Sequence, residues 1–362
     1  MSVNIGIIGL SKSGRTTIFN ALTRGEIDTG KYTPEGSTPH VGMAKVPEPR
    51  LKVLADMLHP KRVVPVSATY IDIGTSVKSI GGQLLTQLSS VDALINVVRA
   101  FRNESIPHIE GSLDTDRDIA NMNLELIFSD LALLERRLDR IAISLKGAKP
   151  PDRSVLLREQ EIVMKIKAGL EKDTPVRELT LTDEEVKALS SYQLLSAKPL
   201  LIAVNIGEDQ LAQAESLAEE LNSRYSQQKC RVITICGELE MELAQLDDKA
   251  AEELRTEYGI KESGVDRILK LSYELLGLIS FFTIVSDEVK AWSIQSGTNA
   301  VKAAGKIHSD MERGFIRAEV IRYQDLVKCG SLAEARKKGL LRLEGKNYIV
   351  EDGDVITFLF NV

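Results

Sequence analysis

Short apolar runs separated by polar loops dominate the first hundred residues and recur between residues 200 and 235. Each run is long enough for one buried strand, and amphipathic stretches such as residues 18–22 lie between them. Strands that alternate with helices are typical of a parallel α/β sheet. Strands are predicted at residues 5–9, 41–46, 64–73, 94–98, 200–204 and 232–235.

The apolar spacing changes to an alternation of four and three from residue 116 onward. This is the 3.5-residue period of a coiled-coil seam. A break at residues 147–151, which contains two prolines, separates a first stripe from a second and predicts an antiparallel helical hairpin. Its charged outer faces fit either simple solvation or partner binding. The stripes are Ile127, Leu131, Leu134, Leu138, Ile141 and Leu145, then Leu156, Val163, Ile166 and Leu170.

The last eighty or so residues show a third hydrophobic pattern, which predicts short strands and a small helix at residues 298–305. This predicts a separate small α+β domain. This part contains a cluster of five basic residues with only one acidic residue, Glu344, among them. The cluster could bind RNA phosphates, or it could be a charged loop that is simply solvated. The strands are predicted at residues 281–285, 289–294, 315–321 and 355–360, and the cations are Arg336, Lys337, Lys338, Arg342 and Lys346.

Length and composition limit the number of domains and the class of protein. A chain of 362 residues exceeds what one hydrophobic core usually serves, and a net charge of −6 argues against a protein that coats nucleic acid over its whole surface. No signal peptide or membrane span is predicted, so we expect a cytoplasmic protein without a membrane partner. We also expect a monomer. The three cysteines lack metal-ligand spacing.

A glycine-rich loop, residues 9–17, directly follows the first predicted strand and precedes the first predicted helix. Gly9 and Gly14 allow successive backbone N–H groups to turn inward and hold phosphate oxygens at the positive end of the helix. The alternative is a plain strand-to-helix turn eased by Gly14. The predicted phosphate-binding residues are Lys12, Ser13, Gly14, Arg15, Thr16 and Thr17.

Residues at the ends of later strands could complete a nucleotide site. Asp72 ends a predicted strand, where it would hold Mg²⁺ together with Thr16; a turn aspartate is the alternative. Asn205 and Glu208 follow another strand and offer donors and acceptors to a purine, although an Asn at this spacing is often a helix cap. Cys236 ends the next strand, at the same predicted ligand edge. Thr33 and Thr38 are candidates for a switch loop.

Several longer motifs resemble the YchF family, the Obg-like ATPases, along essentially the whole chain. Four of these motifs, at residues 303–310, 314–319, 342–346 and 352–354, lie in the C-terminal part. This part looks like a TGS domain, a β-grasp module of ribosome- and RNA-linked proteins. The other motifs are residues 97–101, 108–111, 118–119, 125–127, 130–131, 198–199 and 205–208.

The resemblance implies a P-loop NTPase domain at residues 1–115 and 197–278, a helical coiled-coil insertion at 116–196 and a TGS-like domain at 279–362. The family's Asn and Glu motif, matched by Asn205 and Glu208, goes with a preference for ATP. Ile206 stands where a backbone contact to the base would fall. Val77 or its neighbourhood would replace the water-orienting glutamine of Ras-like GTPases.

The positions at which this sequence departs from the family pattern lie in the phosphate-loop and switch motifs. Arg15 replaces the phosphate-loop lysine, and its planar fork is bulkier than a compact ammonium. Thr75 replaces the glycine of the motif that begins at Asp72. Residues 36–38 read Gly-Ser-Thr where the family has Thr-Ile-Glu. This pattern favours a divergent member whose hydrolysis is weak or absent.

Two hypotheses of different class follow. The first is a slow Mg²⁺-dependent ATPase or GTPase that acts as a ribosome-linked switch, with its catalytic residues unidentified. The second is a ribosome- or RNA-binding regulator that does not hydrolyse nucleotide and binds through the TGS-like and helical domains. A small-molecule kinase is a distant third, because no substrate-lid pattern is present.

Overall fold

The computed structural model describes residues 3–25, 39–73, 87–226, 229–285 and 287–361. The chain forms two compact units. The large unit groups residues 4–43 and 69–268, and the small unit groups residues 1–3, 44–68 and 269–362. The domain boundaries expected from the sequence would instead leave residues 44–68 with the first part of the chain.

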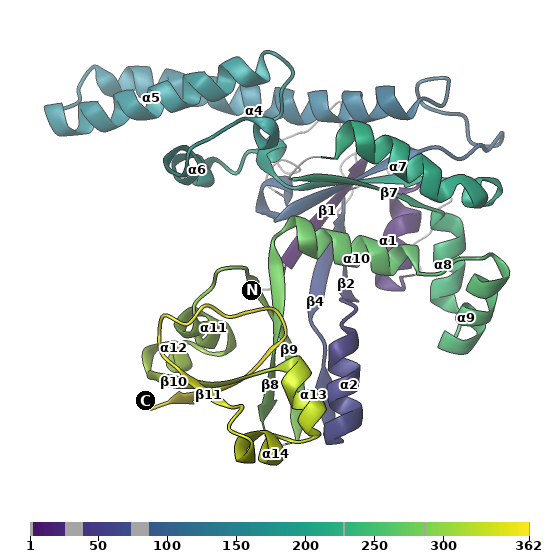
Figure 1. The fold of residues 1–362 in the computed structure, drawn as a ribbon. Helices are drawn as coiled ribbons and strands as arrows, with labels where there is room; N and C mark the ends of the chain where they lie inside the picture. The colour runs from purple at the N-terminus through teal and green to yellow at the C-terminus, as the bar shows by residue number, and fades with distance from the viewer. Residues whose placement is uncertain (1–2, 26–38, 74–86, 227–228, 286, 362) are drawn as a thin grey trace. The chain divides into compact units, whose positions relative to one another are not determined.

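A six-stranded sheet in the order β2-β4-β1-β5-β6-β7 organises the large unit (Figure 1). The strands from β1 to β7 in this order run parallel to their neighbours. Their carboxyl ends therefore meet at one edge, as the sequence predicts. The strands are β1 (Val3–Gly9), β2 (His40–Lys45), β4 (Ser67–Asp72), β5 (Ala93–Arg99), β6 (Leu200–Asn205) and β7 (Cys230–Ile235).

Helices cover this sheet and bury a single large core. Ile119 and Met122 of α4 and Leu221 of α7 pack against strand residues of β5, β6 and β7. Helix α1 contacts α8, which places the starts of both helices near the end of β6. The bounds are α1 (Arg15–Thr23), α6 (Asp183–Leu189), α7 (Ala214–Tyr225), α8 (Gly237–Gln245), α9 (Asp248–Glu257) and α10 (Gly264–Leu275).

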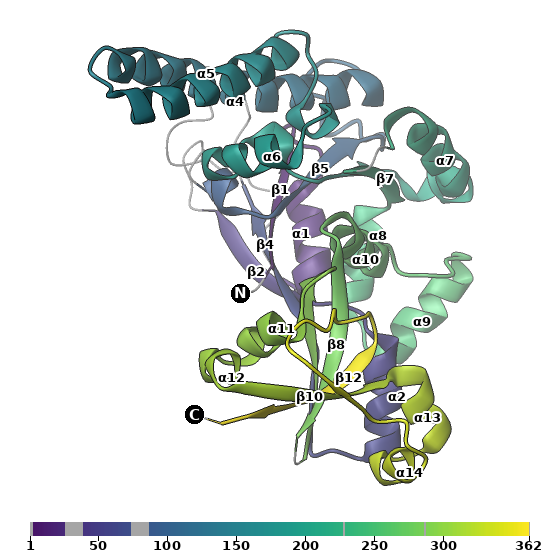
Figure 2. The ribbon, with the colours of Figure 1, turned by 60° about the vertical axis from the view of Figure 1, so that its left-hand side comes forward.

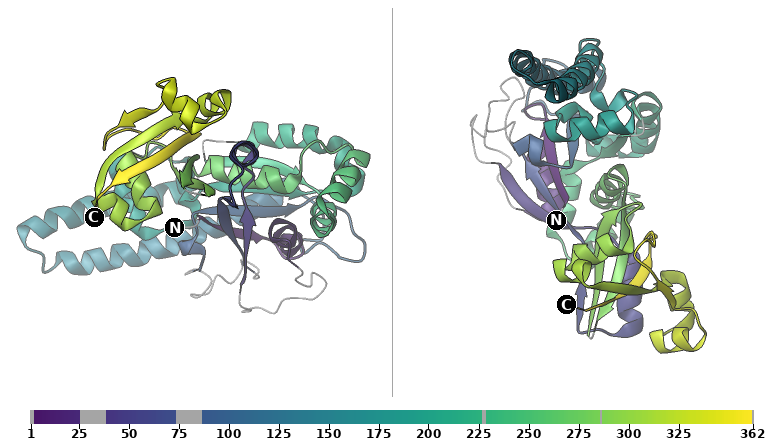
Figure 3. Two further views of the ribbon diagram at one scale, coloured as in Figure 1. Left: turned by 90° about the horizontal axis from the view of Figure 1, so that it is seen from below. Right: turned by 90° about the vertical axis from the view of Figure 1, so that its left-hand side faces the viewer.

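The helical hairpin consists of α4 (Thr115–Leu145) and α5 (Pro150–Leu170), which lie side by side (Figures 1 and 3). The start of α4 belongs to the sheet's core, whereas Ile127 and Leu134 belong to a second core with Val163 and Ile166 of α5. The predicted capping box that opens α6 is also present, with Thr182 and Glu185 bonded reciprocally.

A mixed six-stranded sheet in the order β11-β10-β12-β8-β9-β3 forms the small unit (Figure 2). Helix α11 packs on one face, and α2, α13 and α14 pack on the other. The elements are α2 (Pro49–Leu58), β3 (Arg62–Val64), β8 (Leu278–Val285), β9 (Glu288–Gln295), α11 (Ala300–Ile307), α12 (Ser309–Arg313), β10 (Phe315–Arg322), α13 (Tyr323–Cys329), α14 (Leu332–Lys337), β11 (Arg342–Glu344) and β12 (Asp354–Phe360).

The prediction of one strand over residues 64–73 is wrong. The chain leaves β3, which pairs with β9 in the small unit's sheet, and enters β4 in the other sheet. Pro65 lies between the two strands and lacks the N–H that a continuous ladder needs, so the apolar run is divided there.

Candidate functional site

The glycine-rich loop lies between β1 and α1, and its backbone has three left-handed positions. Gly9 has φ 150°, Lys12 has φ 65° and Gly14 has φ 92°. A Cβ at Gly9 would lie 2.4 Å from the carbonyl oxygen of Val97 on β5, so only glycine fits this approach. The loop is therefore packed closely against the neighbouring strand.

Asn205, at the end of β6, ties this loop to the start of α8. Its Nδ2 donates to the carbonyl oxygen of Ser13 at 3.0 Å, and its Oδ1 accepts from the N–H of Gly237 at 2.9 Å. The side chain is buried, and a Cβ on Gly14 would lie 2.1 Å from its Nδ2. Asn205, which the sequence predicts to contact the base, therefore holds the glycine loop in place. Its amide still has a second N–H that can donate to another acceptor.

Thr16 and Asp72 lie together, as the magnesium prediction requires. The Thr16 hydroxyl donates to Asp72 Oδ2 at 2.7 Å. Asp72 is only 1% exposed, and its Oδ1 has no hydrogen-bond partner among the described residues. A buried carboxylate oxygen without a hydrogen bond, beside a hydroxyl, fits the oxygen-ligand chemistry of Mg²⁺.

Arg15 lies beside the same carboxylate. Its Nη1 donates to the carbonyl oxygen of Ile73, the residue that follows β4. Burial lowers the pKa of the Arg15 guanidinium, and the charge of Asp72 opposes this shift. The cation that replaces the usual lysine is therefore bound at the end of β4.

The remaining predicted loop residues differ in exposure. Ser13 is buried, and its Oγ has no hydrogen-bond partner among the described residues. Lys12 is exposed, and Thr17 is half-buried in the first turn of α1. The Ser13 hydroxyl in the loop and Asp72 Oδ1 at the end of β4 are therefore two buried polar atoms that a ligand could satisfy.

The predicted base-side residues line the carboxyl ends of β6 and β7. Ile206 is buried, and its N–H donates to the carbonyl oxygen of Ile235 at 2.9 Å. Glu208 is exposed and accepts from the Tyr258 hydroxyl at 3.2 Å. Cys236 is buried directly before α8, and burial raises the pKa of its thiol.

The predicted switch residues lie outside the part of the chain that the structure describes. This applies to Thr33, Thr38, Thr75, Val77 and residues 36–38. The predictions on these positions stay predictions.

Arg99 and Phe101, at and just after the end of β5, were not assigned a role from the sequence. The Phe101 ring reaches to 3.8 Å from a Cβ built on Gly14, and the Arg99 guanidinium stacks on that ring at 4.4 Å. Arg99 donates from Nη2 to the carbonyl oxygen of Ile106 at 2.8 Å, while its buried Nη1 has no hydrogen-bond partner among the described residues. Both residues belong to the motif at 97–101, which was the only signal for them.

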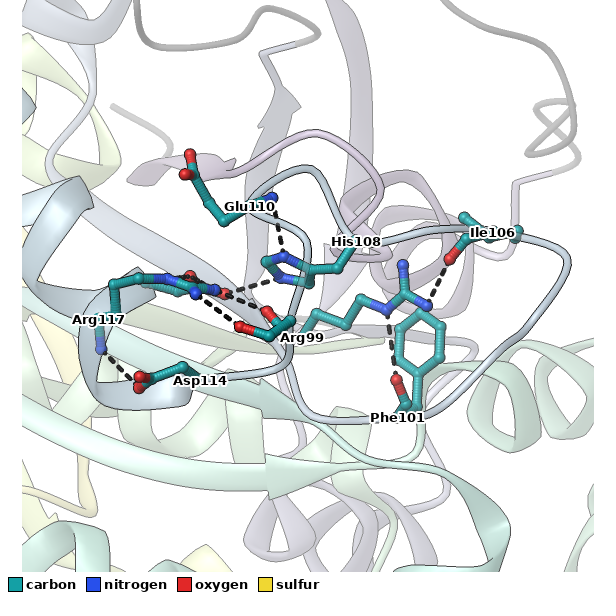
Figure 4. A network of polar contacts seen from close by, with 9 residues as sticks. Arg99, Phe101, Ile106, His108, Glu110, Asp114 and Arg117 are labelled. Atoms are coloured by element: carbon teal, nitrogen blue, oxygen red, sulfur yellow. Dashed lines mark hydrogen bonds and ion pairs between the residues drawn. The ribbon is translucent and has the colours of Figure 1, made fainter.

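A polar network continues from Arg99 along the segment that leads to α4 (Figure 4). His108 Nδ1 accepts from the N–H of Glu110 at 3.1 Å, and its Nε2 lies 2.9 Å from Asp118 Oδ2. Asp118 also accepts from Arg117. Because Nδ1 is an acceptor, Nε2 carries the proton and donates to Asp118. The network thereby fastens the segment after β5 to the first turn of α4.

Comparisons with known proteins agree with this architecture. The chain is 39% identical to the "Ribosome-binding ATPase YchF" of Bacillus subtilis and 35% identical to that of Escherichia coli O157:H7, each over 100% of both chains. The chain belongs to the YchF family. A solved structure, the Schizosaccharomyces pombe YchF GTPase, matches with a TM-score of 0.86 at 30% identity, over 99% of this chain and 98% of that one.

The small unit carries its own YchF match. The model YchF-GTPase_C, described as "Protein of unknown function (DUF933)", covers residues 278–361, from β8 to the end of β12. The family resemblance inferred from the sequence motifs and the predicted mixed α/β fold are thus confirmed. Across the described residues of this YchF chain, no helix is long and apolar enough to cross a membrane.

The C-terminal basic cluster of the YchF chain is largely paired. Arg336 pairs with Glu319 at 2.9 Å, Lys337 with Glu334 at 2.6 Å, and Arg342 with Glu344 at 3.3 Å. Most of the charge that the sequence offers to RNA is therefore compensated within the small unit.

Proposed function

We propose that this chain is a Mg²⁺-dependent purine-nucleotide-binding protein that associates with the ribosome and hydrolyses ATP slowly. The observation that carries the nucleotide part is the contact of Thr16 with Asp72, next to a glycine loop fixed by Asn205. The ribosome part comes from the relatives, which are named ribosome-binding ATPases and match along their whole length.

The phosphates would be held by the loop backbone at the N-terminus of α1. The left-handed turn at Gly14 opens this end of the helix, and no side chain caps it. Unpaired N–H groups at a helix start favour anions. Lys12, Ser13, Arg15 and Thr17 would add donors and positive charge.

Mg²⁺ would be held by Thr16 and Asp72, with the rest of its shell supplied by phosphate oxygens and water. When bound, the ion supplies positive charge that neutralises the phosphates. The buried Asp72 Oδ1, which lacks a hydrogen bond within the described chain, supports this assignment.

The base would lie at the ends of β5, β6 and β7. The second N–H of the Asn205 amide is a donor for a purine ring nitrogen, and the Phe101 ring offers an apolar face beside Gly14. Glu208, Cys236 and the backbone of Ile206 would complete this edge. We propose ATP over GTP because Glu208 stands where the family motif has its ATP-linked carboxylate.

A second candidate function is a regulator that binds nucleotide but does not hydrolyse it. The Arg15 contact with the carbonyl oxygen of Ile73 favours it, because a planar guanidinium bound there does not offer the compact point charge of a lysine ammonium to the phosphates.

The deciding experiment measures phosphate release and ribosome pelleting on the same preparation. We expect the protein to pellet with ribosomes and to release phosphate from ATP faster than an Arg15→Ala variant. Pelleting without phosphate release above that variant would replace the ATPase by the non-hydrolysing regulator. A protein that neither pellets nor binds a non-hydrolysable ATP analogue would contradict both.

A further inference from the structure

Positive charge that is largely uncompensated lies at the far end of the helical hairpin. We define the hairpin tip as residues 136–158, the end of α4, the turn and the start of α5. It carries seven Lys and Arg against two Asp, although the whole chain has a net charge of −6. The cations are Arg136, Arg137, Arg140, Lys146, Lys149, Arg153 and Arg158.

Carboxylates neutralise few of these cations. Arg137 pairs with Glu159, and Arg158 pairs with Glu184. Arg136 and Arg153 donate to the carbonyl oxygens of Ala132 and Leu145, which leaves their charge uncompensated. The side chains of the three others form no ion pair or hydrogen bond within the described residues and are exposed; these residues are Arg140, Lys146 and Lys149.

This arrangement differs from the C-terminal basic cluster. There, three of five cations pair with acids of the small unit, whereas five of the seven tip cations have no carboxylate partner. An internal ion pair must be broken or shared before a cation can meet a phosphate, so the tip is the better polyanion surface. The sequence analysis singled out only the C-terminal cluster.

The local geometry also suits a surface that binds a partner. Arg136 and Arg140 are four residues apart on α4, so their side chains share one face about 6 Å apart along the axis. Ile143, on the same face, is 68% exposed, and Val155 on α5 is 67% exposed. Leu134 and Ile141 are fully buried beneath, so the helix that presents these groups is held in place.

We propose that the hairpin tip binds the phosphate backbone of RNA. RNA is the polyanion that a ribosome-associated protein meets at highest density. The inference therefore rests on the proposed ribosome association, and it names the surface that would bind the ribosomal RNA. Binding to phosphates releases counterions, so the affinity falls as the salt concentration rises. Phosphate contacts also do not distinguish the bases, so the affinity should not depend on the nucleotide sequence of the RNA.

The test uses the full chain and a fluorescein-labelled RNA stem-loop, with affinity measured by anisotropy over a series of KCl concentrations. The tip variant is Arg140→Gln, Lys146→Gln and Lys149→Gln combined. We expect its affinity to fall by about tenfold or more, and the slope of log affinity against log salt to become shallower by about two to three. The matched control neutralises Lys337, Lys338 and Lys346 in the C-terminal cluster, and we expect less than about a threefold change.

Folding of the tip variant is checked by its thermal transition and by binding of a non-hydrolysable ATP analogue, both of which should match wild type. Lys146→Arg with Lys149→Arg should bind RNA like wild type, because these changes keep the charge. A tip variant that binds RNA as wild type does, or a control that loses as much, overturns the inference.

Ribosome pelleting separates failure of this inference from failure of the proposed function. If the wild type pellets with ribosomes but does not bind the RNA, while the tip variant no longer pellets, the tip contacts a ribosomal protein and the RNA inference is overturned. If the wild type binds RNA through the tip but does not pellet with ribosomes, the inference stands and the ribosome association is contradicted.

Discussion

At the scale of single residues, the site depends on one close contact, that between Gly14 and Asn205. The Asn205 amide occupies the space where a Cβ of residue 14 would lie, and it holds two backbone groups from distant parts of the chain. Loop shape and side-chain position are therefore determined together.

Gly14→Ala tests this contact. The added methyl would lie 2.1 Å from Asn205 Nδ2, at a φ of 92° that alanine rarely adopts. We expect a loss of about 1–3 kcal/mol in the free energy of unfolding, measured by urea denaturation, and loss of ATP binding. The control is Gly147→Ala, in the hairpin turn, where a Cβ meets nothing within 4 Å. Wild-type nucleotide affinity in Gly14→Ala would refute the role given to the loop.

Thr16→Val tests the magnesium assignment. Valine keeps the shape of threonine but removes the hydroxyl that donates to Asp72 at 2.7 Å. We expect the factor by which Mg²⁺ raises the ATP affinity to be at least about tenfold smaller in the variant than in wild type. This difference corresponds to about 1.4 kcal/mol of binding free energy. Calorimetric titrations with Mg²⁺ and with EDTA measure this difference. Thr256→Val, at an exposed position of α9, serves as control. Equal Mg²⁺ dependence in Thr16→Val would exclude Thr16 as a ligand.

The sequence predicts the arrangement of much of this candidate site, because the order of strand, glycine loop and helix is a recognisable pattern. Strand, glycine loop, helix and strand-end Asp72 can all be read from spacing. Phe101 could not be predicted as a neighbour of Gly14, because the two are brought together by the pairing of β1 with β5 and no local pattern reports it. The bridging contacts of Asn205 are hidden for the same reason.

At the scale of elements, the junction between the hairpin and the sheet depends on a buried carboxylate. Asp130 on α4 accepts the backbone N–H groups of Leu195 and Ser196, each at 2.8 Å. Burial raises its pKa, because the charged carboxylate is desolvated, and these hydrogen bonds oppose the shift. Asp130 thus couples the helix to the segment that leads into β6.

Asp130→Asn should change both the level and the pH dependence of stability. In wild type, the native carboxyl keeps its proton above about pH 4, where the unfolded chain has released it. The free energy of unfolding therefore falls as pH rises from about 4 through the raised native pKa, and this part of the dependence disappears in the variant. The variant should also lose about 1–3 kcal/mol, because the amide N–H₂ faces a backbone donor.

Urea unfolding at several pH values measures this effect, with Asp139→Asn, exposed on the same helix, as control. The deficit of Asp130→Asn should be largest near pH 4 and should shrink toward neutral pH. A deficit that stays constant over that range would show that the carboxyl does not titrate as described.

Helices and strands with strong periodicity are the elements that the sequence predicts well. The hairpin follows from a seam whose members Ile127, Leu134 and Ile141 are buried in the structure. The run at 64–73 misled because apolar content alone does not say which sheet a strand joins, and only Pro65 marks the break.

At the scale of the whole molecule, residues 44–68 stabilise a unit whose largest part, residues 269–362, follows two hundred residues later. Leu51 and Leu54 of α2 belong to the same core as Phe282 and Val355. No sequence period links such segments, so contiguous boundaries were predicted. Arg50 adds a polar link, with its Nη1 2.7 Å from Asp352 Oδ2.

Arg50→Met tests this link within the small unit. It leaves Glu48 and Asp352 without their shared cation, and we expect a loss of about 1–2 kcal/mol, reduced by the partial exposure of the pair. Tryptophan fluorescence during urea unfolding reports on this unit, because the chain's one Trp is Trp292 on β9. Lys52→Met, exposed on the same helix, should be neutral, and an unchanged transition in Arg50→Met would refute the link.

We propose above that the glycine loop is a working purine-nucleotide site despite Arg15. Calorimetric titration of the native protein with non-hydrolysable ATP and GTP analogues in Mg²⁺, repeated on Arg15→Lys, tests it most directly. We predict saturable one-to-one binding to both proteins, tighter for the ATP analogue. No binding by a folded native protein, with binding restored only in Arg15→Lys or in neither, would contradict the claim.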